Sequence, residues 1–308
     1  VTDYRAFHLT VIGASHIRNG TVCQDCSQSC EKTECRLVVV CDGHGGADYF
    51  RSDRGSKLAA VAFMDCMENP DLIAALSAAA AEKQRQSRME QLIKSIIARW
   101  NSLVEQDMRQ HPFDEDELSG VSEKARRRYE AGERLQAAYG TTLIGAVLAE
   151  NFWLGLQIGD GKCVTVSETG EFAQPIPWDE ECFLNVTTSL CDENAAKEFR
   201  FCFSRTLPAA VFIGSDGIDD CFAGDERLYD FYRVTLKSFA ETDEETAIAQ
   251  LKEYLPTLSE KGSGMATALL AETIAKQTAL GTVIEAGGLA GGIVGVVVST
   301  VGYMVGTA

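Results

Sequence analysis

The sequence predicts an α+β fold, a layered sandwich in which the sheets are mostly antiparallel. Three observations carry this prediction. Short β-rich segments gather in the first 41 residues and again between residues 140 and 215, and helical segments follow each group. The apolar fraction of 45% and the charged fraction of 24% are typical of a globular protein. A chain of 308 residues is also long enough to bury a large core.

The first half predicts strands, then helices. Segment 7–13, FHLTVIG, alternates like a half-buried strand, and 36–41, RLVVVC, is a short buried strand. Helices fill 55–110, where one apolar face is formed by Met89, Leu92, Ile93, Ile96, Ile97 and Trp100. A polar loop at 111–120 precedes a charged helix over 122–138. The three adjacent arginines of that helix are typical of a solvated face.

The second half returns to strands and ends in helices. A β-hairpin is predicted over 140–158, and a further strand over 162–167 follows a Gly-Asp-Gly turn. A late strand covers 210–215, with helices at 226–240 and 243–254.

The net charge of the chain restricts the kinds of partner that it can bind. A net charge of −17 disfavours nucleic acid, because phosphate backbones are bound by Lys and Arg. Excess carboxylate is common on solvated faces, and it is also what hard cations need. Eleven cysteines, an odd number, in a chain of this size without an apolar N-terminal stretch argue against a secreted disulfide scaffold. We therefore expect a reducing, cytoplasmic compartment.

Four of the cysteines crowd into 13 residues: Cys23, Cys26, Cys30 and Cys35. A C-x₂-C spacing is half of a zinc site, but no second C-x₂-C or His pair accompanies it. Reduced thiols are the favoured interpretation, and a zinc or iron–sulfur site is the alternative. Cys41 and Cys163 stand in apolar strands and are predicted to be core residues.

The chain divides into a globular domain over 1–275 and a Gly-rich apolar tail over 276–308. Residues 286–308 carry no charge over 23 positions, which is long enough for a helix to span a bilayer. Glycines spaced four apart favour close helix contact. Two hypotheses follow: a membrane anchor, or a buried or self-associating tail, since glycine lowers helix propensity.

Four acidic residues stand at strand ends or turns: Asp25, Asp42, Asp160 and Asp216. Carboxylates that converge at one sheet edge repel each other unless a cation lies between them. Mg²⁺ and Mn²⁺ take such oxygen ligands. The glycines of DGHGG, residues 42–46, let the backbone approach a ligand, and the Gly43 carbonyl can itself coordinate a metal.

These motifs together resemble a known family. DGHGG, YGTTLIGAVL, IGDGKC and FIGSDGIDD, in this order, are similar to the metal-dependent PP2C-type (PPM) Ser/Thr protein phosphatases. GASHIRNGTVCQD resembles the bacterial branch, and the resemblance covers about residues 7 to 270. It implies a phosphatase domain over 1–275, built as a four-layer α-β-β-α sandwich around two central sheets. A two-metal site, holding Mn²⁺ or Mg²⁺, is expected at one edge.

The resemblance implies a metal-binding role for each acid. Asp42 would bridge both metals, Asp25 and the Gly43 carbonyl would complete one side, and Asp216 the other. Asp160 resembles the carboxylate that holds a weaker third metal. A water shared by the two cations would lose its proton and attack phosphorus in line.

The resemblance also implies roles outside the metal ligands. His44 matches the histidine that protonates the leaving oxygen, and the alternative is a histidine that holds the loop. Arg18 is a candidate for binding the substrate phosphate, although it does not align with the family arginine. His16 is an equivalent candidate.

One departure from the family leaves two functions open. In the stretch SEKGSGMATALLAE, Met265 and Ala266 stand where the family places its final acidic ligand. Asp216, or Asp219 and Asp220 just after it, would have to compensate. The first function is a metal-dependent phosphatase acting on phosphoserine and phosphothreonine proteins and opposing a Ser/Thr kinase. The second is a pseudophosphatase that binds phosphoproteins or a regulatory partner without turnover.

Overall fold

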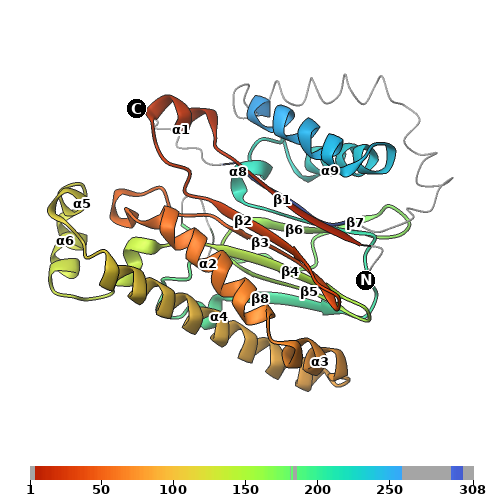
Figure 1. Cartoon of the computed structure of the whole chain (residues 1–308), viewed down its shortest axis with the longest axis horizontal. Coiled ribbons are helices and arrows are strands. Elements are labelled where there is room, and N and C mark those ends of the chain that lie inside the picture. Colours follow the sequence, from red (N-terminus) through yellow and green to blue (C-terminus); the bar gives the residue numbers. More distant parts are fainter. Residues whose placement is uncertain (1–3, 181, 183–185, 259–292, 301–308) are drawn as a thin grey trace.

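Two five-stranded sheets lie face to face in the computed structural model, and helices cover both outer faces (Figure 1). The structure describes residues 4–180, 182, 186–258 and 293–300. The four layers confirm the predicted α-β-β-α sandwich.

The first sheet is antiparallel throughout, in the order β2 (Cys26–Glu31), β3 (Cys35–Cys41), β4 (Leu143–Ala149), β5 (Trp153–Ile158) and β8 (Arg200–Ser204). Its register pairs Val40 with Ile144 and Leu143 with Ile158. The carboxyl ends of β3 and β5 therefore reach the same edge of the sheet.

The second sheet is mixed, in the order β1 (Arg5–Val11), β10 (Ile293–Thr300), β9 (Ala210–Gly214), β6 (Lys162–Val166) and β7 (Phe172–Ala173). β10 runs parallel to both β1 and β9, and β6 pairs antiparallel with β9 and β7. Antiparallel pairs still predominate over the two sheets, as predicted.

β10 comes from the segment that the sequence offered as a membrane helix or a buried tail. Residues 293–300 are a sheet-paired strand in the structure, not a helix. In the part of the chain that the structure describes, no helix has both the length and the apolar character needed to cross a bilayer. The rest of 286–308 lies outside the described residues.

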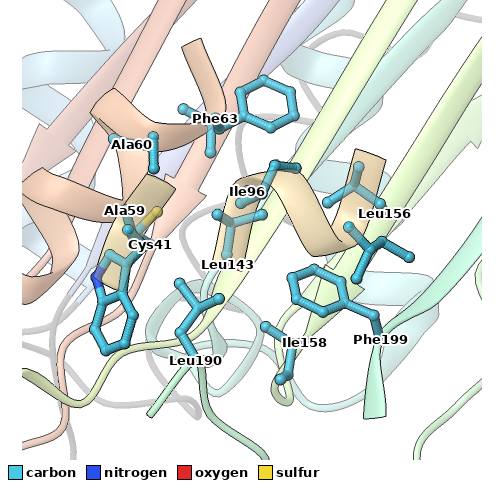
Figure 2. Packing of buried hydrophobic residues seen from close by; sticks show 14 of the residues in the cluster. Cys41, Ala59, Ala60, Phe63, Ile96, Leu143, Leu156, Ile158, Leu190 and Phe199 are labelled. Carbon is cyan, nitrogen blue, oxygen red and sulfur yellow. The ribbon is translucent and has the colours of Figure 1, made fainter. Parts of the chain in front are cut away.

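Alternation along the strands builds three apolar layers. On β3, Leu37 and Val39 face the outer helices, whereas Val38 and Val40 face the other sheet. The outer cluster packs against α2 (Ser52–Met67) and α4 (Glu82–Gln110), as Figure 2 shows for Cys41, Ala59, Phe63, Ile96 and Leu156. Cys41 and Cys163 are buried, which confirms the core prediction for both.

The opposite outer layer lies under α9 (Asp225–Glu241). Phe212 of β9 stacks on Tyr232 of α9 with ring centroids 4.1 Å apart. A further helix over 244–258 completes this layer, close to the predicted 243–254. The remaining short elements are α1 (Ala14–Asn19), η1 (Ala47–Tyr49), α3 (Pro70–Ala78), α5 (Glu115–Ser119), α6 (Glu123–Glu130), η2 (Leu135–Tyr139), α7 (Ala195–Glu198) and α8 (Asp216–Asp219).

The charged helix predicted over 122–138 is shorter than expected. It is α6, which ends at Glu130 and is followed by the separate 3₁₀ turn η2. Gly132, with φ of +73°, has the left-handed conformation that ends helices. Its N–H donates to the Tyr129 carbonyl at 3.0 Å.

Arg51 joins the start of α2 to the 111–117 loop. Its guanidinium forms two hydrogen bonds of 2.7 Å with the Glu117 carboxylate and donates to the carbonyl of His111 at 2.6 Å. It also donates to the Tyr139 hydroxyl at 2.7 Å and lies 4.6 Å from the centre of the Phe113 ring. Arg51 is only 3% exposed, so these contacts replace its hydration.

We expect Arg51→Met to lower the free energy of unfolding by about 2 kcal/mol, because it leaves Glu117 and the carbonyl acceptors without their donor. Glu117 is partly exposed, which moderates the loss. Urea denaturation measures the effect. Arg54→Met is the matched control: Arg54 is more exposed and makes one ion pair, of 3.1 Å with Asp107. An equal loss in both variants would contradict the role of Arg51.

Candidate functional site

Three of the four predicted acids meet at one edge of the sandwich. β3 ends directly before Asp42, β9 ends two residues before Asp216, and Asp25 directly precedes β2. The carboxyl groups of Asp25 and Asp216 lie close enough to Asp42 to shift its pKa. Asp160, after β5, is close enough to influence Asp42 and Asp216 electrostatically. The predicted acids are thus brought together from segments up to 191 residues apart in the chain.

Burial and mutual repulsion shift the pKa values of these acids upward. Desolvation, and then the neighbouring Asp25 carboxylate, raise the pKa of Asp42 well above its ordinary value. Desolvation and the charges of Asp42 and Asp160 do the same to the pKa of Asp216. Burial also raises the pKa of Asp160, against a hydrogen bond from Thr187. Such a cluster is stable only with bound protons or a bound cation.

The YGTT motif fixes the Asp42 backbone. The Asp42 N–H donates to Thr142 Oγ1 at 3.1 Å, and the Asp42 carbonyl accepts from Thr142 N at 2.8 Å and Thr141 Oγ1 at 2.9 Å. Sequence reasoning assigned no role to these threonines. Each contact joins residues about 100 positions apart in the chain, so the sequence signal available for it was the YGTT motif itself.

Gly43 lies where a side chain does not fit. A Cβ there would be 2.5 Å from the Gln24 carbonyl oxygen and 2.7 Å from that of Ser52. Gln24, overlooked in the sequence, donates through Nε2 to the His44 carbonyl at 3.0 Å and to Ser52 Oγ at 2.7 Å. Gln24 therefore places an amide that holds the loop directly before Asp25, a residue that is 4% exposed.

His44 is enclosed by neighbouring segments. Its Nε2 is 2.8 Å from Ser189 Oγ, and its ring meets Tyr49 edge-on with centroids 4.8 Å apart. Burial lowers the pKa of His44 to about 4. A Cβ on Gly140 would come within 2.6 Å of the His44 ring, so this glycine leaves room for it. Ser189 was not identified from the sequence, because only the fold brings it to His44.

Lys162 pairs with two acids that follow Asp216 in the chain. Lys162 Nζ pairs with Asp219 at 3.1 Å and with Asp225 at 2.8 Å. Burial raises the pKa of Asp219 to about 7, against the effect of Lys162. Lys162 also acts on Asp220, and both Asp219 and Asp220 interact electrostatically with Asp216. Asp220 acts on Asp160 as well. Compensation for a missing acid by either residue stays a prediction.

The two candidate phosphate ligands lie on α1. The Arg18 side chain is exposed and makes no hydrogen bond or ion pair with the described residues. His16 is half-buried, and burial lowers the pKa of its ring. No described contact brings either side chain to the acids, so their roles stay predictions.

The N-terminal cysteines are free thiols, as are the other cysteines of the chain. Cys26 lies directly opposite Cys41 in the register of β2 and β3. Among the described ranges, no three His, Cys, Asp or Glu side chains are already arranged as a ligand set for a metal ion.

The acids nevertheless fit a hard cation by their chemistry. Carboxylates as close as Asp42 and its acidic neighbours repel one another when ionised, and the pKa values of Asp42 and Asp216 are raised accordingly. A divalent cation can relieve this repulsion by binding the carboxylate oxygens. The donors are all oxygen atoms, which suits Mg²⁺ and Mn²⁺ rather than softer metals.

Comparison with known proteins gives one family and several similar folds. Residues 12–256 match the family model described as Protein phosphatase 2C. No curated protein matches the chain.

Several solved structures are similar to the chain at low sequence identity. Serine/threonine phosphatase Stp1 from Staphylococcus aureus is 16% identical, with 78% of this chain and 85% of that chain covered and a TM-score of 0.48. A bacterial serine phosphatase is 16% identical, with coverages of 78% and 87% and a TM-score of 0.46. The catalytic domain of PstP, in complex with two manganese ions, is 14% identical, with coverages of 78% and 88% and a TM-score of 0.43.

Proposed function

The chain belongs to the protein phosphatase 2C family, and from that premise we propose that it hydrolyses phosphoserine and phosphothreonine in proteins with the help of divalent metal ions. The meeting of Asp25, Asp42 and Asp216 at one sheet edge is the observation that carries this proposal. Clustered carboxylates supply the oxygen ligands that hard divalent cations take. Its substrates would be the products of a Ser/Thr kinase.

We assign the ligands as the family resemblance implies. Asp42 would bridge two ions, Mn²⁺ or Mg²⁺, with Asp25 and the Gly43 carbonyl on one side and Asp216 on the other. Asp160 would hold a weaker third ion. When bound, the ions would supply a water of lowered pKa and neutralise charge on the phosphoryl oxygens. The chain's own part is to position the ligands, and Thr141 and Thr142 do this for Asp42 by holding its backbone.

Of the two roles expected for His44, the contacts favour that of loop anchor. Its Nε2 is used by Ser189 and its ring is packed against Tyr49. Proton donation to the leaving oxygen would have to use the other ring nitrogen, Nδ1. The anchor role keeps DGHGG, and so Asp42, close to the YGTT strand.

A calorimetric Mn²⁺ titration beside a hydrolysis assay tests the proposal. We expect Mn²⁺ binding and Mn²⁺-dependent release of phosphate from a phosphothreonine peptide, because a divalent cation can bind the clustered carboxylates and relieve their mutual repulsion. EDTA should abolish both, and added Mn²⁺ should restore them. Hydrolysis that persists after complete chelation would contradict the metal mechanism.

The pseudophosphatase is the second candidate, and one sequence observation favours it. By the family resemblance, Met265 and Ala266 stand where the final acid is expected, and both lie outside the described residues. In that case Mn²⁺ or phosphopeptide would bind without turnover.

Met265→Asp separates the two candidates. If the missing acid weakens one metal, the variant should bind Mn²⁺ about ten- to a hundredfold more tightly, with the gain in rate largest at low Mn²⁺. If Asp220 already fills this position, affinity should stay flat or fall. Calorimetric Mn²⁺ titrations of the wild type and Met265→Asp, run side by side, distinguish the two outcomes. Met265→Leu is the control, because it changes the side chain without adding an oxygen.

A further inference from the structure

A groove along α6 carries a charge opposite to that of the chain as a whole. Its lining consists of Glu123, Lys124, Arg127, Arg128 and Glu133. The chain has a net charge of −17, yet cations outnumber carboxylates in this groove. No step of the proposed hydrolysis uses these residues.

The groove lies beside the DGHGG loop. Asp48 in η1, just after that loop, accepts hydrogen bonds from Ser122 N at 2.7 Å and Ser122 Oγ at 2.8 Å. The Tyr129 hydroxyl of α6 donates to the Asp48 carbonyl at 2.7 Å. Tyr49, the next residue, is the aromatic neighbour of His44. Figure 1 shows α5 and α6 beside the start of α2, at the end of the sandwich where this loop lies.

The arginines of α6 differ in what they bind. Arg126 pairs with Glu115 and with Glu130, and Arg127 pairs with Glu123, as expected for a solvated face. Among the described residues, Arg128 and Lys124 pair with no carboxylate. These two cations of the groove are therefore available to an outside anion.

Arg128 is also held in place. Its guanidinium lies 4.7 Å from the centre of the Tyr129 ring and donates to the Tyr129 hydroxyl at 2.9 Å. Its Nε is sheltered from solvent, so the outer nitrogens of the guanidinium are the ones that can meet an outside anion. A guanidinium held in this way can present those nitrogens to a carboxylate.

We propose that the α6 groove binds acidic side chains of the phosphoprotein substrate, a few residues from the phosphorylated residue. The proposal rests on the proposed function, and it names the substrate class. An extended peptide advances about 3.3 Å per residue, so three or four residues cover roughly 10 to 13 Å. Contacts through Asp48 and Tyr49 join the groove to the DGHGG loop, so residues that flank the phosphorylated residue are the ones expected to reach it. Charge attraction at such a partly exposed site would favour acidic over basic flanks.

Phosphothreonine peptides with a common core and flanks of Asp, Ser or Lys test the proposal, with p-nitrophenyl phosphate as a substrate too small to reach the groove. In the wild type we expect kcat/KM to be about tenfold higher with Asp than with Ser flanks, and lowest with Lys flanks. The Lys124→Ala/Arg128→Ala variant should lose this preference and keep its turnover of p-nitrophenyl phosphate. The preference should also weaken as salt rises.

Arg126→Ala is the matched control, since Arg126 lies on the same helix, is paired with two glutamates and does not line the groove. It should keep the preference for acidic flanks. Equal rates on all three peptides in the wild type, or an equal loss of preference in Arg126→Ala, would overturn the proposal. Neither result would affect the phosphatase assignment, which turnover of p-nitrophenyl phosphate tests separately.

A second measurement covers the case in which no substrate is turned over. Fluorescence anisotropy of a labelled, unphosphorylated Asp-flanked peptide reports binding to the groove without catalysis. We expect binding to the wild type and to Arg126→Ala, and at least tenfold weaker binding to Lys124→Ala/Arg128→Ala. Equal binding to all three proteins would overturn the groove proposal. The absence of turnover would count only against the proposed function.

Discussion

Asp42→Ala is expected to lower kcat by about 10³-fold or more, which corresponds to roughly 4 kcal/mol of lost transition-state stabilisation. Both Asp25 and Asp216 act electrostatically on Asp42, which is the proposed bridging ligand, so its loss would remove an oxygen ligand from both proposed metal positions. Steady-state hydrolysis of a phosphothreonine peptide at saturating Mn²⁺ measures the effect. Asp53→Ala is the control, because within the described ranges Asp53 forms an ion pair only with the nearby Lys57, at 3.2 Å.

Thermal unfolding of the same variant gives a second readout that is independent of activity. In metal-free buffer we expect Asp42→Ala to unfold at the same temperature as the wild type or higher, because one of three adjacent buried carboxyl groups is gone. Added Mn²⁺ should raise the Tm of the wild type and leave that of the variant almost unchanged. Near-normal turnover in a folded Asp42→Ala protein would show that the site assignment is wrong.

The strand ends that carry the acids could be predicted from the sequence. Apolar β-rich runs stop directly before Asp42 and shortly before Asp216, and this local pattern needs no knowledge of the fold. The residues that hold these acids could not be found in the same way. Thr142 meets Asp42 across 100 residues and Ser189 meets His44 across 145, so their roles follow only from strand register and loop placement.

Hydropathy alone could not distinguish the two hypotheses for the apolar tail. Both a bilayer and the interior of a sheet select uncharged residues, so the composition of 286–308 does not separate a membrane helix from a strand. The run of β-branched residues in 293–300 favours a strand, and these residues form β10 between β1 and β9. The charged helix shows a different limit: α6 ends where Gly132 takes a left-handed conformation, which the helical periodicity around it does not reveal.

The glycines of DGHGG differ in the space around them, so alanine at Gly43 is expected to reduce activity much more than alanine at Gly45. Gly43→Ala is expected to lower kcat by about 10²-fold and to cost roughly 1 to 3 kcal/mol of stability. The added Cβ would lie 2.5 Å from the Gln24 carbonyl oxygen and 2.7 Å from the Ser52 carbonyl oxygen. Both obstacles are backbone atoms, so the loop itself must move.

That movement would act on the acids directly, because Gly43 follows Asp42 and Gln24 precedes Asp25. Gly45→Ala is the matched control within the same motif, since a Cβ there meets only Gln24 Oε1, at an ordinary 3.7 Å. Peptide hydrolysis at several Mn²⁺ concentrations, beside urea denaturation, compares the two variants. We expect Gly45→Ala to keep activity within a few-fold of the wild type. If both alanines behaved alike, close packing at Gly43 would not be what positions Asp42, and the glycines of this loop would need another explanation.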